Sequence, residues 1–284
     1  MAECPRISVI TPSYNQGRFI GDTIRSVLDQ GYPNLEYIII DGGSTDETID
    51  VIQKYEHRLT HWVSEKDGGA ADALRRGFRI ATGDIFAYLN SDDVYLPDAL
   101  HTVSAVMRDP DVDVAFGNIY WMDRDGRTGG ERRQTRFSRQ AYLFGAADLM
   151  QPATFWKRDV YFRSGEIDPS YRFAFDTDLF FRFAANDARF RHVNRFLASF
   201  RIHPDSKSSN DEILCAAELE RLRREHLPVP FNSPRARLIR TVARAQRTLH
   251  YALQGDALWL LGRIPDRLRA RWSPEIVGPR ARRL

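Results

Sequence analysis

Asp84-Ile-Phe-Ala-Tyr-Leu-Asn-Ser-Asp-Asp93 is the stretch of this sequence that decides the fold. Five apolar residues in a row, 85–89, are typical of a short strand that is buried on both faces of a sheet. Four polar residues, 90–93, follow them without a break. Because ligands in an open α/β sheet bind beyond the carboxyl ends of the strands, we expect a functional site at this point.

Asp92 and Asp93 place two carboxylates next to each other at that point. Adjacent carboxylates repel each other unless a cation or hydrogen-bond donors share them. A hard divalent cation held by one or two carboxylates, with substrate phosphates completing its shell, would remove the conflict. The alternative is that these residues merely cap a helix that begins near Pro97.

The chain before this stretch alternates short apolar runs with segments of helical spacing. We expect strands at residues 7–11, 35–41, 59–63 and 85–89, and helices at 19–30, from about 44 to 54, and at 70–81. Such repetition predicts an α/β fold with a mostly parallel sheet and helices on both faces.

Acidic residues follow several of these strands. Asp41 and Asp67 lie just past apolar runs, as the Asp92-Asp93 pair does, so the fold would gather them on one edge of the sheet. An acid there can bind ribose hydroxyls or a base N–H, while a turn-forming role before Gly42 is the alternative for Asp41. Neither a Gly-x-x-x-x-Gly-Lys-Ser/Thr loop nor a Gly-x-Gly-x-x-Gly fingerprint is present, which favours phosphate binding through a metal.

Three motifs in order, Ile7-Ser-Val-Ile-Thr-Pro-Ser-Tyr-Asn15, Ile40-Asp-Gly-Gly-Ser-Thr-Asp46 and Leu89-Asn-Ser-Asp-Asp93, resemble those of the family 2 glycosyltransferases. The resemblance covers about residues 6–210. It implies the GT-A fold, a nucleotide-sugar donor, a divalent cation (Mg²⁺ or Mn²⁺) and inversion at the anomeric carbon. A UDP-sugar is the first expectation for the donor, and dTDP- and GDP-sugars are the alternatives.

The same resemblance implies roles for residues of the first half. The nucleotide-sugar contacts carried over from the family are Thr11, Pro12, Tyr14, Asp41 and Asp67. Asp92 is expected at the ribose and Asp93 at the metal. Asn90 stands where many members of the family have the first Asp of this motif.

Asp176 and Asp178 open a predicted helix in the second half, where an acid can cap the helix or complement its dipole. The resemblance implies instead that Asp176 is the catalytic base, although Phe175 replaces the usual Glu beside it. A carboxylate suffices for this role, because an acceptor hydroxyl loses its proton only as it attacks the anomeric carbon.

Residues 196–203 read as a strand that ends in the pattern Arg201-x-His203-x-x-Ser206-x-Ser208. A single His after a strand is most often a loop residue. The pattern resembles the closing loop of the family, which implies His203 as a metal ligand and Arg201 and Ser206 at the diphosphate or the acceptor.

The C-terminal part differs from the rest in charge. Residues 221–284 contain fifteen Arg, no Lys and four acids, about +11, whereas the remaining residues carry about −8. We expect helices at 211–226 and 235–253, the second with an aliphatic face (Leu238, Val242, Ala245, Leu249, Ala252) opposite an Arg face (Arg237, Arg240, Arg244, Arg247). Either this helix packs on the catalytic domain, or residues 235–272 bind an anionic membrane surface. Nucleic acid is not an expected partner, since no recognised binding motif is present.

The length of 284 residues and the 43% hydrophobic content fit one large α/β domain with an appendage. We expect a catalytic domain at 1–210, divided into a nucleotide-sugar half (1–118) and an acceptor half (119–210), and a helical extension at 211–284. Cys4 and Cys215 match no metal spacing. The absence of a signal peptide pattern and of a membrane-spanning run predicts a cytoplasmic protein, peripheral on the inner face of the plasma membrane if the extension binds lipid.

The expected function is therefore inverting, metal-dependent transfer of a sugar from a nucleotide-sugar donor to a glycan or lipid-linked acceptor in cell-surface polysaccharide synthesis. The alternative is a non-catalytic nucleotide-sugar-binding or scaffold protein on the same fold. A nucleotidyltransferase is disfavoured, because residues 11–18 lack a glycine-rich triphosphate loop with Arg or Lys.

Overall fold

The computed structural model describes residues 4–204, 212–256 and 259 of the chain. The chain forms two compact units, of which the first consists of residues up to 134 and 150–201. The second unit consists of residues 135–149 and the residues from 202 onward. Residues 135–149, expected in the acceptor half of the catalytic domain, thus group with the C-terminal helices.

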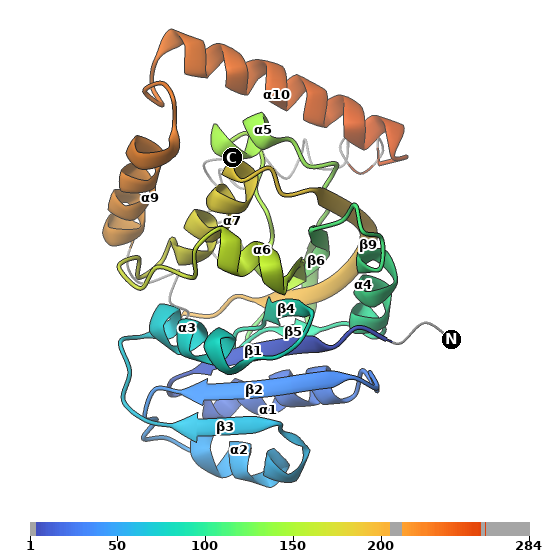
Figure 1. Ribbon diagram of the computed structural model, residues 1–284, viewed down its shortest axis with the longest axis vertical. Helices are drawn as coiled ribbons and strands as arrows, with labels where there is room; N and C mark the ends of the chain where they lie inside the picture. The colour runs from blue at the N-terminus through green and yellow to red at the C-terminus, as the bar shows by residue number, and fades with distance from the viewer. Residues whose placement is uncertain (1–3, 205–211, 257–258, 260–284) are drawn as a thin grey trace. The chain divides into compact units, whose positions relative to one another are not determined.

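The first unit is built on a sheet whose first four strands are parallel (Figure 1). Its strands lie in the order β3 (His61–Ser64), β2 (Leu35–Asp41), β1 (Ile7–Ser13) and β4 (Ile85–Tyr88), and all four run in the same direction. The carboxyl ends of these strands therefore meet at one edge, as the alternation of strands and helices in the sequence predicts.

The sheet is mixed beyond β4. There β8 (Thr154–Lys157) lies antiparallel between β4 and β6 (Val114–Met122), and β9 (Phe190–Arg201) runs parallel to β6. The outer strand β5 (Val94–Tyr95) pairs antiparallel with β9, and β7 (Thr128–Arg132) forms a hairpin with β6. Residues before α6 (Arg158–Arg163) form the 3₁₀ turn η2 (Gln151–Ala153) and then β8, so the chain passes through a strand before that helix begins.

One face of the sheet is covered by helices α1 (Gly17–Leu28), α2 (Thr48–Tyr55) and α4 (Ala99–Met107), and the short turn η1 (Glu56–Arg58) follows α2. Alternate residues of the strands point toward these helices, as the two-residue period of a strand requires. The core on this face includes Ile7, Val9, Ile20, Ile24, Val27, Tyr37, Ile39, Ile52, Ala87, Leu100 and Val103. These contacts tie α1 to the end of β1.

The opposite face is covered by α3 (Ala70–Ile80), α6 (Arg158–Arg163) and α7 (Phe175–Ala185). Its core is aromatic, with ring centroids 4.9–6.0 Å apart among Phe78, Phe86, Trp156, Tyr161, Phe180 and Phe183. All six side chains are fully buried. Aromatic side chains bury large areas in defined orientations, so this cluster fixes α7 against the sheet.

The second unit contains the short helix α5 (Arg139–Leu143) and the two C-terminal helices α9 (Glu212–His226) and α10 (Pro234–Leu253). Both C-terminal helices match the helices expected from the sequence. Within this unit α10 packs on α5, where Ala141, Ala146 and Ala243 form a small core. None of the helices in the described part of the chain is long and apolar enough to span a bilayer.

Candidate active site

The turn after β4 carries the two adjacent acids. It is closed by a bond from the Asp93 N–H to the Asn90 carbonyl (3.1 Å), and β5 begins directly after it. Helix α4 begins later, with Asp98 at its N-cap position. The alternative in which Asp92 or Asp93 merely caps that helix is therefore wrong.

The two acids of this turn differ sharply in exposure. Asp93 is 1% exposed, and its Oδ1 accepts the backbone N–H of Arg201 at 2.9 Å. Asp92 is half-buried. Burial raises the pKa of the Asp93 carboxyl well above its ordinary value, and the neighbouring charge of Asp92 raises it further. Asp92 is thus the member of the pair whose carboxylate a ligand can approach.

Asn90 is matched to its surroundings as an amide. Its Nδ2 donates to Gln151 Oε1 at 3.3 Å and lies 3.4 Å from Asp93 Oδ2, and Gln151 Nε2 donates to the Tyr88 carbonyl at 2.6 Å. An Asp at position 90 could donate neither bond at neutral pH. Sequence reasoning missed Gln151, because no local pattern pairs it with a residue 61 positions earlier.

Arg201 ends β9 and is buried, with a side chain that is 2% exposed. Its Nε donates to the Asp92 carbonyl (2.7 Å), Nη1 to the Arg124 carbonyl (3.1 Å) and Nη2 to Asp22 Oδ2 (3.1 Å). Its guanidinium also lies 4.9 Å from the centroid of the Phe19 ring. Arg201 therefore joins the acidic turn, α1 and the β6–β7 hairpin. Its guanidinium N–H groups donate to other residues of the protein.

Asp41 ends β2 and is completely buried. Its carboxylate accepts four hydrogen bonds, from the Gly43 and Ser44 N–H groups and from the Ser44 and Ser64 hydroxyls, at 2.6–3.1 Å. Gly43 has φ +81°, which favours glycine. This geometry supports the turn-forming alternative for Asp41, because its carboxylate organises the loop after β2.

The loop after β1 presents one exposed aromatic ring. Thr11 and Pro12 are buried within β1, and the Thr11 hydroxyl is 3.1 Å from that of Tyr37. Tyr14, by contrast, is 60% exposed. Next to it, Asn15 accepts from the Thr45 N–H and donates its own N–H to Ser44 Oγ, so the loops after β1 and β2 are held together. Of the predicted contacts in this loop, Tyr14 has the side chain accessible to a base.

Asp67 is half-buried in the loop after β3, and its carboxylate lies against the loop after β2. Its Oδ1 accepts the Gly69 N–H at 2.7 Å. A Cβ on Gly42 would lie 3.0 Å from the same oxygen, so Gly42 leaves the room that this carboxylate occupies. Asp67 therefore lies at the same sheet edge as Asp41, as predicted.

Asp176 occupies the first turn of α7, one residue after the helix begins, and is half-buried. Ala174 holds the N-cap position, so the alternative in which Asp176 caps the helix is wrong. Its Oδ1 accepts the N–H of the next residue, Thr177, at 2.6 Å. The ring of Phe175 lies 6.2 Å from that of Tyr88, which brings the start of α7 to the carboxyl end of β4.

Asp178, in the same turn of α7, has a structural role. It is buried and pairs with Arg182, whose Nη2 lies 2.7 Å from Asp178 Oδ2. Arg182 also donates to the carbonyls of Ser164, Gly165 and Glu166 at the end of α6. Asp178 thus holds α7 against α6, which leaves Asp176 as the acid of this pair that can reach a substrate.

Two predicted residues fall beyond the first unit. His203 is buried and belongs to the second unit, so its role at a metal stays a prediction. Ser206 lies outside the described residues.

No cluster of three or more His, Cys, Asp or Glu side chains in the described residues could hold a metal ion by itself. Mg²⁺ is usually bound through one or two carboxylates and substrate phosphates, and does not need a cage made of protein alone. The Asp92-Asp93 pair, with its mutual repulsion, fits a cation that arrives with an anionic ligand.

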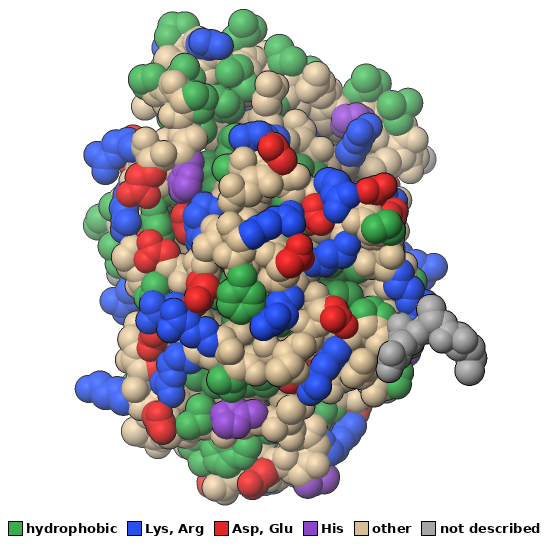
Figure 2. Space-filling view, in the orientation of Figure 1, with side chains coloured by type: hydrophobic (Ala, Val, Ile, Leu, Met, Phe, Trp, Pro, Cys, Tyr) green, Lys and Arg blue, Asp and Glu red, His purple; other side chains and the backbone are tan. Residues whose placement is uncertain are grey.

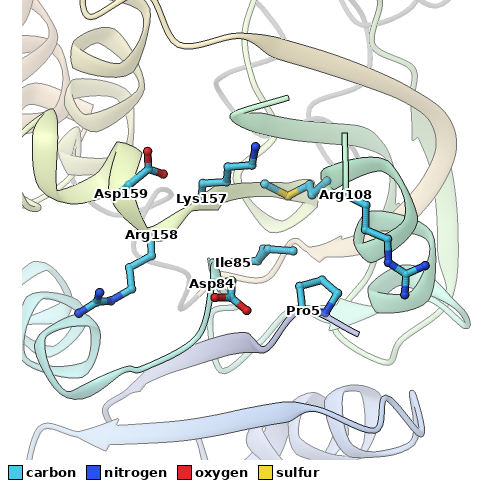
Figure 3. Close-up of a pocket in the computed structure, with 8 residues that line it drawn as sticks. Pro5, Asp84, Ile85, Arg108, Lys157, Arg158 and Asp159 are labelled. Carbon is cyan, nitrogen blue, oxygen red and sulfur yellow. The ribbon is translucent and has the colours of Figure 1, made fainter. Parts of the chain in front are cut away.

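A pocket of about 390 Å³ lies at the amino end of β4, lined among others by Pro5, Asp84, Ile85, Lys157 and Arg158 (Figure 3). Ile85 is the first residue of β4, whereas Asp92 and Asp93 follow its last residue. This pocket is therefore separate from the acidic turn, and the candidate active site remains the edge formed by the carboxyl ends of the strands.

The profile described as "Glycosyl transferase family 2" matches residues 8–190, which include all of β1 after its first residue, the acidic turn and α7. The chain belongs to glycosyltransferase family 2. Of the site residues predicted from the sequence, Arg201, His203 and Ser206 lie beyond the range that matches this family, and the others lie within it.

Named relatives in the family are similar over part of their length. The chain is 40% identical over 125 residues to the "Putative teichuronic acid biosynthesis glycosyltransferase TuaG" of Bacillus subtilis, covering 43% of this chain and 50% of that protein. It is 34% identical over 120 residues to "Glycosyltransferase GlyG" of Streptococcus pneumoniae, covering 41% and 40%. The match thus spans half or less of these two relatives.

Solved structures share the fold. TarS residues 1–349 of S. aureus in complex with UDP-GlcNAc has a TM-score of 0.64 at 17% identity, over 87% of this chain and 72% of that one. The Pyrobaculum calidifontis mannosyltransferase PcManGT in complex with GDP-Man and Mn²⁺ has a TM-score of 0.63 at 19% identity, over 96% and 82%. The expected GT-A fold with C-terminal helices is confirmed.

Proposed function

We propose that this protein is an inverting glycosyltransferase that transfers a sugar from a nucleotide-diphosphate sugar to a glycan or lipid-linked acceptor in cell-surface polysaccharide synthesis. The observation that carries the proposal is the pairing of two acidic elements at one sheet edge. Contact between Tyr88 and Phe175 brings the start of α7, with Asp176, to the end of the strand that leads into Asp92 and Asp93. The name of the B. subtilis relative supports the polysaccharide context.

Asp176 is the proposed base. As the acceptor oxygen attacks the anomeric carbon, its proton passes to the Asp176 carboxylate. The new carbon–oxygen bond forms while the bond from that carbon to the diphosphate oxygen breaks, and the nucleoside diphosphate leaves with the electron pair. A single displacement of this kind inverts the anomeric configuration. Asp176 is half-buried, so it is accessible to an acceptor.

The nucleoside is proposed to lie along the loops after β1, β2 and β3. Tyr14 offers an exposed ring on which a base can stack. Asp67 supplies a half-buried carboxylate for donor hydroxyls or a base N–H. Asp41, Thr11 and Pro12 would support these loops from beneath. The relatives in complex with UDP-GlcNAc and GDP-Man support a nucleotide sugar, with UDP first and GDP or dTDP as alternatives.

A divalent cation, Mg²⁺ or Mn²⁺, is proposed to accompany the donor, as a Mn²⁺ accompanies GDP-Man in the fold relative. When bound, it would stabilise the negative charge of the leaving diphosphate. The exposure of the two acids favours Asp92 as the direct ligand, with Asp93 behind it. This is the reverse of the order that the family resemblance implies. His203 stays a proposed further ligand.

The test is a panel of UDP-, dTDP- and GDP-sugars assayed with the full chain in Mg²⁺, Mn²⁺ or excess chelator. A bound donor should raise the melting temperature only with metal present. The shift should be measurable, because a ligand at about 100 times its Kd stabilises the folded state by about 2.7 kcal/mol. Release of nucleoside diphosphate should then depend on an acceptor. Donor binding without turnover under all conditions would favour the non-catalytic alternative. Donor binding that is equally tight in excess chelator would show that the cation has no part in donor binding.

Arg201→Met tests how the acidic turn is supported. The change removes the donors to the Asp92 and Arg124 carbonyls, both part-buried, and we expect a loss of about 2–4 kcal/mol in the free energy of unfolding. Donor affinity should fall with it, because the turn is no longer held. Arg201→Lys should recover part of the stability. Chemical denaturation and calorimetric titration with donor would measure both.

Arg18→Met is the matched control. Arg18 also links α1 to the hairpin, through Asp125 at 3.0 Å, but both side chains are about half exposed. Exposed pairs contribute at most about 1 kcal/mol, so this variant should stay close to the parent in stability. If Arg201→Met instead loses donor affinity at unchanged stability, Arg201 contacts the diphosphate directly, as the family resemblance implies.

A further inference from the structure

Helix α1 carries a row of polar side chains that point into the protein. Charged side chains of both signs are interspersed on the surface, as Figure 2 shows for one face. Thr23 and Gln30, by contrast, are buried, and Ser26 between them is half-buried. Their spacing of three and four residues puts them on one side of α1 and of the turn that continues it. A buried polar side chain is costly unless it forms hydrogen bonds, so this row needs partners.

The partners are backbone groups at the end of the acidic turn and just beyond it. Thr23 Oγ1 donates to the Asp93 carbonyl at 2.7 Å, and Ser26 Oγ accepts the Tyr95 N–H at 3.0 Å. The Gln30 side-chain amide donates to the carbonyl of the residue after Tyr95 at 2.9 Å. The three side chains that form these bonds are here called the α1 ladder.

The position of β5 explains why these backbone groups need side chains as partners. In the described residues, β5 is the last strand in the sheet order and pairs on one side only, with β9. Backbone groups at the free edge of a sheet need partners from elsewhere. The α1 ladder supplies them, so it attaches the chain from Asp93 through β5 to the helix.

Asp93 is thereby held at two points. Thr23 bonds to its backbone carbonyl, and the Arg201 N–H bonds to its carboxylate at 2.9 Å. The Arg201 side chain returns to α1 as well, because its Nη2 donates to Asp22, the neighbour of Thr23, at 3.1 Å. The position of the acidic turn therefore depends on α1.

The other end of α1 is tied to the loop after β2. The Gln16 and Gly17 N–H groups donate to Thr48 Oγ1 at 2.8 Å and to Asp46 Oδ2 at 3.0 Å. Tyr14 lies just before this point in the chain. An α-helix of 12 residues spans about 18 Å. Helix α1 thus connects the loop that carries Tyr14 with the acidic turn and is anchored by hydrogen bonds at both.

We propose that Thr23 is a positioning residue for donor binding. With the rest of the α1 ladder, it holds the acidic turn where a donor diphosphate and its cation can reach Asp92. This inference rests on the proposed sugar transfer. A misplacement of about 1 Å is enough to weaken a site, and hydrogen bonds from behind the ligating residues prevent it. Thr23 is completely buried, so it acts through the turn and not by contact with the donor.

Thr23→Val keeps the shape of the side chain and removes its hydroxyl. Loss of one hydrogen bond changes an equilibrium by up to about tenfold. The Kd for UDP or GDP with Mn²⁺ should therefore rise about three- to tenfold, and the melting temperature should fall by about 2–4 °C. Without nucleotide or metal, the backbone amides of residues 93–96 should exchange with solvent up to about tenfold faster. Thr23→Ser keeps the hydroxyl and should return all three values close to those of the parent.

Ser26→Ala repeats the test with a smaller change, and Ser104→Ala is its matched control. Ser104 is buried on α4 and accepts the Tyr32 hydroxyl at 2.9 Å, so the control also loses a hydroxyl and one hydrogen bond. Tyr32 also donates to the carbonyl of Pro5, just before β1, at the sheet edge opposite the acidic turn. The control should lower the melting temperature by a similar amount and keep the parental Kd and the parental amide exchange at 93–96.

The proposal fails if Thr23→Val and Ser26→Ala lower the melting temperature but bind UDP or GDP as the parent does, because the α1 ladder then contributes stability alone. It also fails if amide exchange at 93–96 is unchanged, or if Thr23→Ser binds as weakly as Thr23→Val. Failure of the proposed function gives a different result. The parent itself would then bind neither nucleotide with Mn²⁺, and this inference would fall with it, whereas parental binding in the variants of an active parent removes this inference alone.

Discussion

Replacing Asp176 with Asn is expected to lower kcat by about 10²–10⁴-fold while donor affinity stays nearly unchanged. Asn keeps the size of the side chain and still accepts the Thr177 N–H, so the first turn of α7 should persist. It cannot take a proton from the acceptor hydroxyl. Steady-state rates with a soluble acceptor, together with calorimetric titration of the donor, separate the two effects.

Asp178→Asn is the control for this prediction, two residues along the same helix. Asp178 is buried against Arg182, and loss of its charge leaves a part-buried guanidinium with carbonyl partners only. We expect a loss of about 2–4 kcal/mol in the free energy of unfolding. The molecules that remain folded should keep kcat within a few-fold of the parent. One variant thus loses rate and the other loses stability.

Two results would contradict the role of Asp176. Equal losses of donor affinity and of rate in Asp176→Asn would identify it as a residue that binds the nucleotide. If Asp176→Asn transferred sugar at the rate of the parent, Asp176 would have no part in the reaction, and another base would have to take the acceptor proton.

Asp92→Asn is expected to abolish the metal-dependent part of donor binding and to reduce transfer at least about a hundredfold, with stability unchanged. The reason is exposure, because Asp92 is the half-buried acid of the pair and a cation shared with the diphosphate can reach it. Melting temperatures with and without Mn²⁺ and donor would measure the effect. In the parent the donor should raise the melting temperature only when the metal is present.

Asp93→Asn is the companion variant. Its carboxylate is buried and accepts the Arg201 N–H at 2.9 Å, so we expect the change to act first on the geometry of the turn. Asn can still accept this bond through its carbonyl oxygen if the amide is oriented accordingly. A stable Asp93→Asn protein that loses all metal dependence, beside an Asp92→Asn protein that keeps it, would restore Asp93 as the ligand.

The sequence determined the order of strands and helices in the first half of the chain and the loops in which the candidate site residues lie. Unbroken apolar runs followed by polar clusters identified β1, β2 and β4 and the loops at their carboxyl ends, because a buried strand and its exposed end differ in local composition. The motifs that resemble family 2 glycosyltransferases lie within the range that the family profile matches. Helix α10 was also readable, since its 3.6-residue period is a local property.

Only the tertiary structure decided what each of these side chains does. Asp92 and Asp93 are adjacent in sequence, yet Asp93 is buried and accepts the backbone N–H of Arg201, 108 residues later, whereas Asp92 is half-buried. The Asp41 carboxylate accepts hydrogen bonds from its own loop, and the Asn90 amide donates a hydrogen bond to Gln151. The antiparallel β8 between β4 and β6 could not be foreseen either, because strand pairing depends on contacts distant in the chain.

The orientation of α10 shows the same limit. Its sequence defines an aliphatic face and Arg residues, but a hydrophobic period alone favours packing through the aliphatic face. The structure packs the face of Ala236, Ala243 and Tyr251 instead and leaves Leu238 and Leu249 exposed. A helical pattern is set by residues three and four apart, whereas the partner of each face is set by residues far away, here Ala141 and Ala146. The sequence therefore determined that α10 has two faces, and tertiary packing decided which one is buried.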